Sequence, residues 1–255
     1  MQRDQLSTLR ADVLERARSA FAHMDEISEQ NTKKVLDVMR ACRVSDVHFN
    51  VSAGYAYSDL GREKLDEVYA RVFGAERALV RTQFVSGTHA LAAVLFGLLR
   101  PGDRLVSITG TPYDTMQTVI GWAHESCGSL KEFGVSYDEL PLREGHVDLD
   151  SIAHVMTPET KIALVQRSRG YSEREPLSIA DIRAVSARIK AANPNCIVFV
   201  DNCYGEFVET EEPTAIADVD IMAGSLIKNP GGGLAPTGGY IAGRSDLVEM
   251  ASYRL

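Results

Sequence analysis

The sequence predicts an α/β fold in which helices flank both faces of a mostly parallel sheet. Two observations lead to this prediction. From residue 77 onward, short apolar segments alternate with longer segments in which apolar residues recur every three or four positions. No internal repeat or low-complexity linker interrupts the pattern. Strands that alternate with helices in this way favour parallel pairing through crossover helices.

The first 44 residues are expected to be helical, because apolar residues recur at helical spacing on both sides of a polar break at residues 28–31. Residues 45–60 look irregular. A further helix is expected from about Gly61 to Phe73, with Gly74 as its stop signal. We therefore expect a helical segment over residues 1–44 and one large domain over residues 45–255.

The alternating region is expected to contain the remaining strands and helices. The expected strands are 77–80, 104–108, 161–165, 196–200, 221–223 and 239–242. The expected helices are 88–99, 116–122, a segment capped by Asp148 that ends at Met156, and a helix through Ala191 that Ser178 caps with help from Asp181.

Composition narrows the class of protein. The chain has 255 residues, 45% of them hydrophobic, which is enough for a large core, and a net charge of −8. It has no basic stripe for nucleic acid, no signal peptide, and no apolar stretch near the roughly 20 residues that span a bilayer. The four cysteines form no metal or CxxC pattern, and the histidines lack metal-site spacing, so we expect free thiols and no metal. These features fit a soluble cytoplasmic enzyme that acts on small molecules.

Asp201 and Lys228 form the most informative pair. Asp201 follows a buried strand, and Lys228 follows a short apolar strand in the pattern Ser225-x-x-Lys228. Many enzymes hold pyridoxal phosphate with such a pair, in which the lysine forms a Schiff base and the aspartate faces the ring nitrogen. The apolar neighbours Leu226 and Ile227 should desolvate the lysine and favour its free amine. The alternatives are a surface lysine and an aspartate that caps a helix or forms a salt bridge.

Two further segments fit a phosphorylated ring. Ser86, Gly87 and Thr88 open a helix after the first strand, so free amides, a glycine and two hydroxyls could cradle a phosphate there. Tyr113 follows the next strand and could lie against the ring. Open α/β sheets bind ligands at the carboxyl ends of their strands, where both segments fall. The alternatives are an ordinary helix cap and a turn tyrosine.

The glycine-rich segment 231–236 raises the possibility of a nucleotide-binding loop. The motifs GxxxxGK[ST] and GxGxxG are both absent, which favours a flexible turn. Tyr57 and Arg62, taken alone, suggest a tyrosine-rich loop and a solvated arginine.

Several motifs occur along the chain in a definite order. They are Tyr55-x-Tyr57 with Arg62, Ser86-Gly-Thr-His89, Thr111-Pro-Tyr-Asp114, Asp201-Asn-Cys-Tyr-Gly-Glu-Phe207 and Ser225-x-x-Lys-Asn-Pro-Gly-Gly-Gly233. This order resembles the fold-type-I pyridoxal-phosphate enzymes, and most specifically the methionine gamma-lyase-like group called aluminium resistance proteins, which are relatives of the cystathionine lyases. The resemblance extends from about residue 20 to the end of the chain.

The resemblance implies a seven-stranded large domain like that of aspartate aminotransferase, with pyridoxal 5'-phosphate as cofactor. It also implies roles for individual residues and a homodimer or homotetramer, in which a tyrosine and an arginine reach the neighbouring subunit's phosphate. The implied roles are phosphate binding by Ser86, Gly87, Thr88 and Ser225, ring stacking by Tyr113, contact with the ring nitrogen by Asp201, covalent attachment at Lys228, and completion of the neighbour's site by Tyr57 and Arg62.

The implied activity is that of a carbon–sulfur lyase of the methionine gamma-lyase or cystathionine lyase type. Lys228 would remove the alpha proton of a sulfur amino acid, and the products would be a thiol, ammonia and a 2-oxo acid. The alternatives are an aminotransferase and a non-catalytic regulatory or cofactor-binding protein of the same fold.

Members of the group continue into a small C-terminal domain that carries the arginine for the substrate carboxylate. We expect this chain to be the large domain without the small one, ending inside a helix that begins near Ser245. Arg167 and Arg169 are the nearest substitutes for that arginine, and we expect them to serve the fold or the phosphate.

Overall fold

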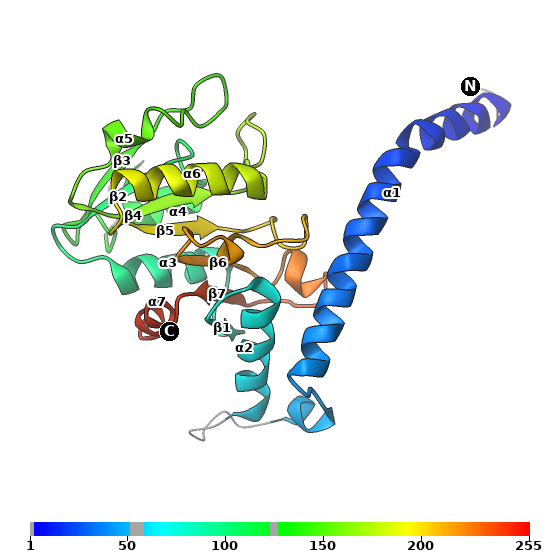
Figure 1. Ribbon diagram of the computed structural model, residues 1–255, viewed down its shortest axis with the longest axis horizontal. Coiled ribbons are helices and arrows are strands. Elements are labelled where there is room, and N and C mark those ends of the chain that lie inside the picture. The colour runs from blue at the N-terminus through cyan, green and yellow to red at the C-terminus, as the bar shows by residue number, and fades with distance from the viewer. Residues whose placement is uncertain (1–2, 52–58, 123–126) are drawn as a thin grey trace.

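The computed structural model describes residues 3–51, 59–122 and 127–255, and its centre is a seven-stranded sheet (Figure 1). The strand order is β1-β7-β6-β5-β4-β2-β3. The strands are β1 (Arg77–Arg81), β2 (Arg104–Ser107), β3 (Ser136–Glu139), β4 (Thr160–Gln166), β5 (Ile197–Asp201), β6 (Ile221–Ser225) and β7 (Gly239–Gly243). Only the pairs that include β7 are antiparallel, so the prediction of a mostly parallel sheet is confirmed.

The orientation of β7 determines where a site can form. β1 and β6 both pair with β7 in the antiparallel sense, so they run in the same direction as the parallel strands. Arg81 and Ser225, the last residues of β1 and β6, both lie opposite Gly239. The carboxyl ends of the functional strands therefore meet along one edge of the sheet, as ligand-binding α/β sheets require.

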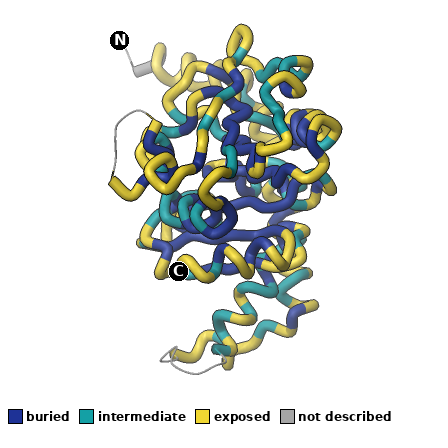
Figure 2. The backbone as a smooth tube through the Cα atoms, turned by 90° about the vertical axis from the view of Figure 1, so that its left-hand side faces the viewer, coloured by how far each residue is buried: buried dark blue, intermediate teal, exposed yellow. Residues whose placement is uncertain are grey.

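Two hydrophobic cores lie on opposite faces of the sheet. Successive side chains of β5 alternate between them, with Val198 and Val200 in one core and Ile197 and Phe199 in the other. Figure 2 shows the buried strands as a dark band among more exposed segments. The first core packs against α2 (Leu60–Phe73), α5 (Ile152–Val155) and α6 (Ile179–Ala192), and the second against α3 (Gly87–Leu98), α4 (Asp114–Ile120) and α7 (Ser245–Ser252).

The expectation of helix over the first 44 residues is confirmed by one long helix, α1 (Arg3–Ala41). The polar break at residues 28–31 interrupts the apolar pattern but not the helix. Those residues include no glycine or proline that would end a helix. The side chain of Asn31 donates hydrogen bonds to the carbonyl oxygens of Phe207 and Glu209. The first half of α1 points away from the sheet (Figure 1). Among the described residues, no helix has the length and apolar character needed to cross a bilayer.

Most of the other expected elements are confirmed within a few residues. Ser178 and Asp181 form the expected capping box at the start of α6. Asp148, by contrast, caps no helix. It accepts a hydrogen bond from the hydroxyl of Ser151, and Ser151 itself precedes the short helix α5. The half-exposed edge strand β3 was not expected from its residues, because Ser136–Glu139 has no apolar run.

An aromatic cluster joins α2 to the sheet. The ring of Phe73 lies 5.3 Å from that of Tyr69, 5.2 Å from that of Tyr240 and 5.7 Å from that of Phe207, and Phe73 is 1% exposed. Such a side chain contributes both burial and ring contacts to stability.

We expect Phe73→Ala to lower the free energy of unfolding by about 3–5 kcal/mol, because it leaves a cavity where three other rings meet. Phe133→Ala is the matched control, since Phe133 is 55% exposed and its ring contacts only the edge of Phe96 among the described rings. The control should cost less than about 1 kcal/mol. Urea unfolding followed by circular dichroism measures both, and equal losses would contradict this account of the cluster.

Candidate functional site

The carboxyl edge of the sheet brings together most of the residues that the sequence singles out. Asp201 is the last residue of β5, and Ser225 is the last residue of β6. Side chains alternate along a strand, and both of these follow residues of the second core by two positions, so they face the side of the sheet that α3 covers. The start of α3 follows β1 on the same edge.

Gly87 permits a close approach between the start of α3 and the end of β6. A methyl group on Gly87 would lie 3.0 Å from Cβ of Ser225 and 3.1 Å from Sγ of Cys203. The hydroxyl of Ser225 is buried and has no hydrogen-bond partner among the described residues. A buried hydroxyl beside the free amides of a helix N-terminus is suited to an anionic group.

The neighbouring hydroxyls already have partners. Ser86 is the N-cap of α3, and its Oγ accepts a hydrogen bond from the His89 amide at 3.2 Å, as an ordinary helix cap does. Its hydroxyl hydrogen remains available to an acceptor. Oγ1 of Thr88 lies 2.7 Å from Oγ1 of Thr115, so these two hydroxyls are already bonded to each other.

Asp201 is a buried acid with few local donors. It is 5% exposed, and its Oδ1 accepts a hydrogen bond from the Cys203 amide at 3.1 Å. Burial raises the pKa of Asp201, while the charges of Lys228 and Arg174 act in the opposite direction. Arg174 is itself buried and donates to the carbonyl oxygen of Gln166 at 2.7 Å.

Lys228 lies just beyond the end of β6, and its amine is 4.2 Å from the centre of the Tyr204 ring. The lysine is half-buried, with Leu226 8% exposed and Ile227 48% exposed. The expected apolar enclosure is therefore present on one flank only, because Lys228 leaves the strand edge and precedes the short 3-10 helix η3 (Asn229–Gly231). Asn229 donates a hydrogen bond to the carbonyl oxygen of Tyr204 at 3.1 Å and so holds the main chain from which the ring extends.

Tyr113 is held against a second tyrosine. Its ring stacks on that of Tyr171 with centres 5.4 Å apart, and its hydroxyl donates to the Tyr171 hydroxyl at 3.2 Å. This hydrogen bond raises the pKa of Tyr113 to about 12, and Tyr204 is among the groups that act in the same direction. The Tyr113 amide donates to Oε1 of Gln166 at 2.7 Å, which ties the tyrosine to the end of β4.

A buried polar network lies behind Asp201. Glu206 accepts a hydrogen bond from the Tyr240 hydroxyl at 2.8 Å, and Tyr240 accepts one from Asn202 at 3.3 Å. Asn202 also donates to Oε2 of Glu212 at 3.0 Å. Glu206 and Glu212 are each 1% exposed, and burial raises the pKa of both, that of Glu206 to about 8.

Arg167 serves this network. It is 2% exposed, donates to Oδ1 of Asn202 at 3.0 Å and to Oε2 of Glu209 at 2.6 Å, and lies 3.6 Å from Oε2 of Glu212. Arg169 is exposed and lines a cavity of about 630 Å³ that Tyr204 also borders. Arg167 borders the same cavity, but its guanidinium is buried and paired with Glu209 and Glu212, so Arg169 is the more exposed charge of the two.

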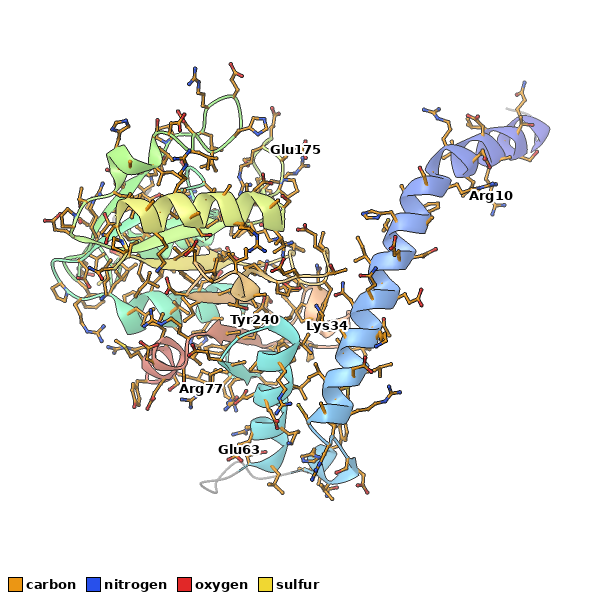
Figure 3. The ribbon with its side chains drawn as sticks, viewed as in Figure 1. Arg10, Lys34, Glu63, Arg77, Glu175 and Tyr240 are labelled. Carbon is orange, nitrogen blue, oxygen red and sulfur yellow. The ribbon has the colours of Figure 1, made fainter. Side chains whose placement is uncertain are left out.

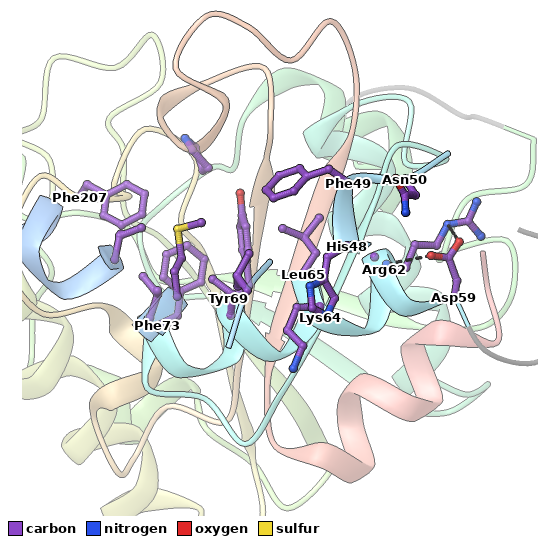
Figure 4. Close-up of a pocket in the computed structure, with 17 residues that line it drawn as sticks. His48, Phe49, Asn50, Asp59, Arg62, Lys64, Leu65, Tyr69, Phe73 and Phe207 are labelled. Atoms are coloured by element: carbon purple, nitrogen blue, oxygen red, sulfur yellow. Dashed lines mark hydrogen bonds and ion pairs between the residues drawn. The ribbon is translucent and has the colours of Figure 1, made fainter. Parts of the chain in front are cut away.

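Arg62 lies elsewhere within the same chain. It forms an ion pair with Asp59, with Nε and Oδ2 3.3 Å apart, in a groove of about 660 Å³ between α1 and α2 (Figure 4). That groove is lined by Tyr69, Phe73 and other largely apolar side chains, and by none of Ser86, Asp201 and Lys228. Tyr57 lies outside the described residues.

Several residues of the site were not predicted from the sequence. Tyr204 and Glu206 belong to the quoted segment 201–207, and polar residues directly after a buried strand were a usable signal for them. Tyr171 and Arg174 follow β4 and come into place through the fold. Together, the edge offers an anion cradle, a buried acid, a lysine amine and aromatic rings, which suits a planar ring that carries both positive charge and a phosphate.

Comparison with known proteins places this arrangement in a family. A family model described as methionine gamma-lyase matches residues 6–255. A carbon–sulfur lyase involved in aluminium resistance from Clostridium novyi NT is 47% identical with a TM-score of 0.93, over 98% of this chain and 60% of its own. The uncharacterized protein YnbB of Bacillus subtilis (strain 168) is 50% identical over 91% of this chain and 55% of its own length.

The fold has a wider distribution than the family. The pyridoxal-5'-phosphate dependent protein YhfS of Escherichia coli has a TM-score of 0.67 at 18% identity, over 90% of this chain and 58% of its own, which establishes likeness of fold alone. This chain thus spans about three fifths or less of the length of these relatives.

We expect Arg167→Ala to lower the free energy of unfolding by about 3 kcal/mol or more, because it leaves Glu212 buried without its cation. Arg169→Ala is the control and should change stability by no more than about 0.5 kcal/mol, since the side chain is exposed. Chemical unfolding at pH 7 separates the two. An unchanged free energy of unfolding in Arg167→Ala would show that Arg167 does not have this structural role.

Proposed function

The chain belongs to the methionine gamma-lyase family, and from this premise we propose that it is the cofactor-binding part of a pyridoxal-phosphate-dependent carbon–sulfur lyase. The substrate would be a sulfur amino acid, and the products a thiol, ammonia and a 2-oxo acid. The observation that carries the proposal is the convergence of Gly87, the unpartnered Ser225 hydroxyl and buried Asp201 on one edge of the sheet, beside Lys228.

Each residue has a role that its surroundings support. The phosphate would lie at the start of α3, where Ser86, Gly87 and Thr88 present amides and hydroxyls and where the helix dipole favours an anion. Ser225 would donate its free hydroxyl to the same phosphate. Tyr113 would lie along the face of the ring.

Asp201 would meet the protonated ring nitrogen. A buried carboxylate needs a positive partner, and in the described residues Asp201 has only the more distant charges of Lys228 and Arg174. Bound pyridoxal phosphate supplies a ring that accepts the electron pair left by removal of a proton beside an amino group. A negative Asp201 keeps the ring nitrogen protonated, which strengthens that capacity.

Lys228 would hold the cofactor and then move the alpha proton of the substrate. Its position at the end of β6, over the Tyr204 ring, keeps the amine at the mouth of the site and limits its rotation. An aminotransferase would use the same residues, so the products decide between the two activities. A new amino acid in place of thiol and ammonia would indicate transamination, and no turnover would indicate a non-catalytic protein.

We also propose that the protein acts as a homodimer or homotetramer in which Tyr57 and Arg62 complete a neighbour's site. Arg62 supports this, because it lies in a surface groove apart from Asp201 and Lys228 of its own chain. Isologous pairing of two copies is the commonest form of protein oligomer, and it would let each copy supply these residues to the other.

Borohydride reduction of the protein with pyridoxal phosphate should attach the cofactor to the peptide that contains Lys228. Lys228→Arg should abolish the labelling. Lys34→Arg is the matched control, because Lys34 also lies over an aromatic ring of the same segment, that of Phe207 at 5.8 Å, and this variant should label normally. Peptide mass spectrometry provides the measurement, and labelling at a different lysine would reject the assignment.

Asp201→Asn should slow exchange of the substrate's alpha proton by about a hundredfold, equivalent to about 2.7 kcal/mol, because a neutral side chain no longer keeps the ring nitrogen protonated. Asp246→Asn is the control, since Asp246 is exposed and pairs with Arg244. Deuterium incorporation followed by nuclear magnetic resonance gives the rates. Unchanged exchange in Asp201→Asn would remove Asp201 from this role.

A further inference from the structure

Glu206 is a buried acid that the proposed chemistry does not use. Its Oε1 accepts the Tyr240 hydroxyl, and its Oε2 has no hydrogen-bond partner among the described residues. A methyl group on Gly224 would lie 2.5 Å from Oε1 of Glu206, so the carboxyl group rests directly on the β6 backbone, one residue before Ser225. Figure 3 labels Tyr240 on the sheet and Lys34 on α1.

The surroundings of Glu206 favour a proton over a negative charge. Buried acids in its own segment and on β5 repel an ionised carboxylate, and Arg167 is already paired with Glu209 and Glu212. Burial raises the pKa of Glu206 to about 8. The titratable or charged groups around it are Tyr240 on β7, Tyr69 on α2, Asp201 on β5, Cys203 and Glu212 in its own segment, Lys34 on α1 acting on Glu212, and Arg167 beyond β4.

The main chain of Glu206 is tied to the neighbour of Lys228. Asn229 donates one hydrogen bond to the carbonyl oxygen of Glu206 at 2.9 Å and another to that of Tyr204 at 3.1 Å. The Tyr204 ring in turn lies under the Lys228 amine. Tyr204 and Phe207 both have left-handed backbone conformations, with φ of 67° and 62°. Non-glycine residues keep such conformations only where surrounding contacts hold them.

We propose that Glu206 is a positioning residue whose protonated, buried carboxyl group keeps residues 202–209 in place and thereby keeps Tyr204 and Asn229 against Lys228. Ionisation of Glu206 places an unpaired charge on the β6 backbone, and the segment loosens from its contacts. The functional meaning of Lys228 rests on the function proposed above, whereas the proton on Glu206 and its effect on the segment do not depend on a cofactor.

The expected pH dependence follows from where the proton is held. The native Glu206 keeps its proton up to a pH of about 8, while in the unfolded chain the group ionises near its ordinary 4.5. Between these values the native state binds more protons, so its stability falls as pH rises. The stabilisation is complete below pH 4.5 and is lost through pH 8. One proton corresponds to a tenfold fall in the folding equilibrium constant for each pH unit.

Glu206→Gln tests the proton directly, because glutamine is neutral at every pH. In cofactor-free protein, urea unfolding from pH 5 to pH 9 should show a fall in stability that is clearly smaller in Glu206→Gln, while the part of the fall that belongs to the other buried acids, Asp201 and Glu212, remains. Glu211→Gln is the control, since Glu211 is exposed and pairs with Arg183, and it should retain the wild-type fall. Equal pH profiles for wild type and Glu206→Gln would overturn the proposal.

The positioning role needs a second measurement on the same cofactor-free protein. The ratio of Lys228 to Lys33 acetylation by acetic anhydride, measured by mass spectrometry, should rise above pH 8 in wild type as the Tyr204 contact loosens, whereas the ratio in Glu206→Gln should not rise. Lys33 is the reference because its side chain is 76% exposed on α1. The same ratio at every pH in both proteins would overturn the link to Lys228.

Tyr240→Phe keeps the proposal testable if Glu206→Gln does not fold. The Tyr240 hydroxyl stabilises the ionised carboxylate, so its removal should raise the pKa of Glu206 and move both pH transitions upward. If neither pH transition moves in Tyr240→Phe, ionisation of Glu206 does not cause them and the proposal is wrong. Failure of borohydride to label Lys228 would reject the proposed function alone, because neither pH experiment contains the cofactor.

Discussion

Burial of negative charge at the carboxyl edge of the sheet is the constraint on which this structure depends. Asp201, Glu206 and Glu212 are each at most 5% exposed. A buried charge must be paired, protonated or bound to a ligand. Glu212 has Arg167, together with hydrogen bonds from Asn202 and the Phe207 amide. Each of the three acids therefore needs its own means of lowering the cost of a buried charge.

Asp201 is the acid that the proposed ligand would neutralise. Among the described residues it accepts hydrogen bonds from the amide and the thiol of Cys203, and the positive charges that act on it are those of Lys228 and Arg174. The Ser225 hydroxyl lies on the same side of the sheet, beside Gly87, and has no hydrogen-bond partner among the described residues. A ligand with a cationic ring nitrogen and an anionic group would satisfy both at once, which is why the two observations together carry more weight than either alone.

The sequence predicts what local chemistry determines. Apolar runs located all the strands except β3, whose half-exposed residues have no such run, and the glycine stop at Gly74 and the capping box at Ser178 were visible in the residues. The cap at Asp148 failed for a local reason, because Asp148 accepts a hydrogen bond from the Ser151 hydroxyl and Ser151 itself precedes α5. The role of Asn31 depends on a tertiary contact, since Asn31 bonds to a segment about 176 residues away. The site divides in the same way. Asp201 and Lys228 follow strands, whereas Arg174 and Glu206 acquire their surroundings only through folding.

The same tertiary contacts join α1 to the site. Asn31 donates to the carbonyl oxygens of Phe207 and Glu209, and Lys34 donates to that of Thr210 at 3.1 Å. Asn229 donates to the carbonyl oxygens of Tyr204 and Glu206, so the segment after Asp201 is held both by α1 and by the neighbour of Lys228. The helix therefore supports the segment in which Tyr204 meets the lysine. The left-handed backbone of Tyr204 and Phe207 explains the need for that support, because non-glycine residues keep such conformations where surrounding contacts hold them.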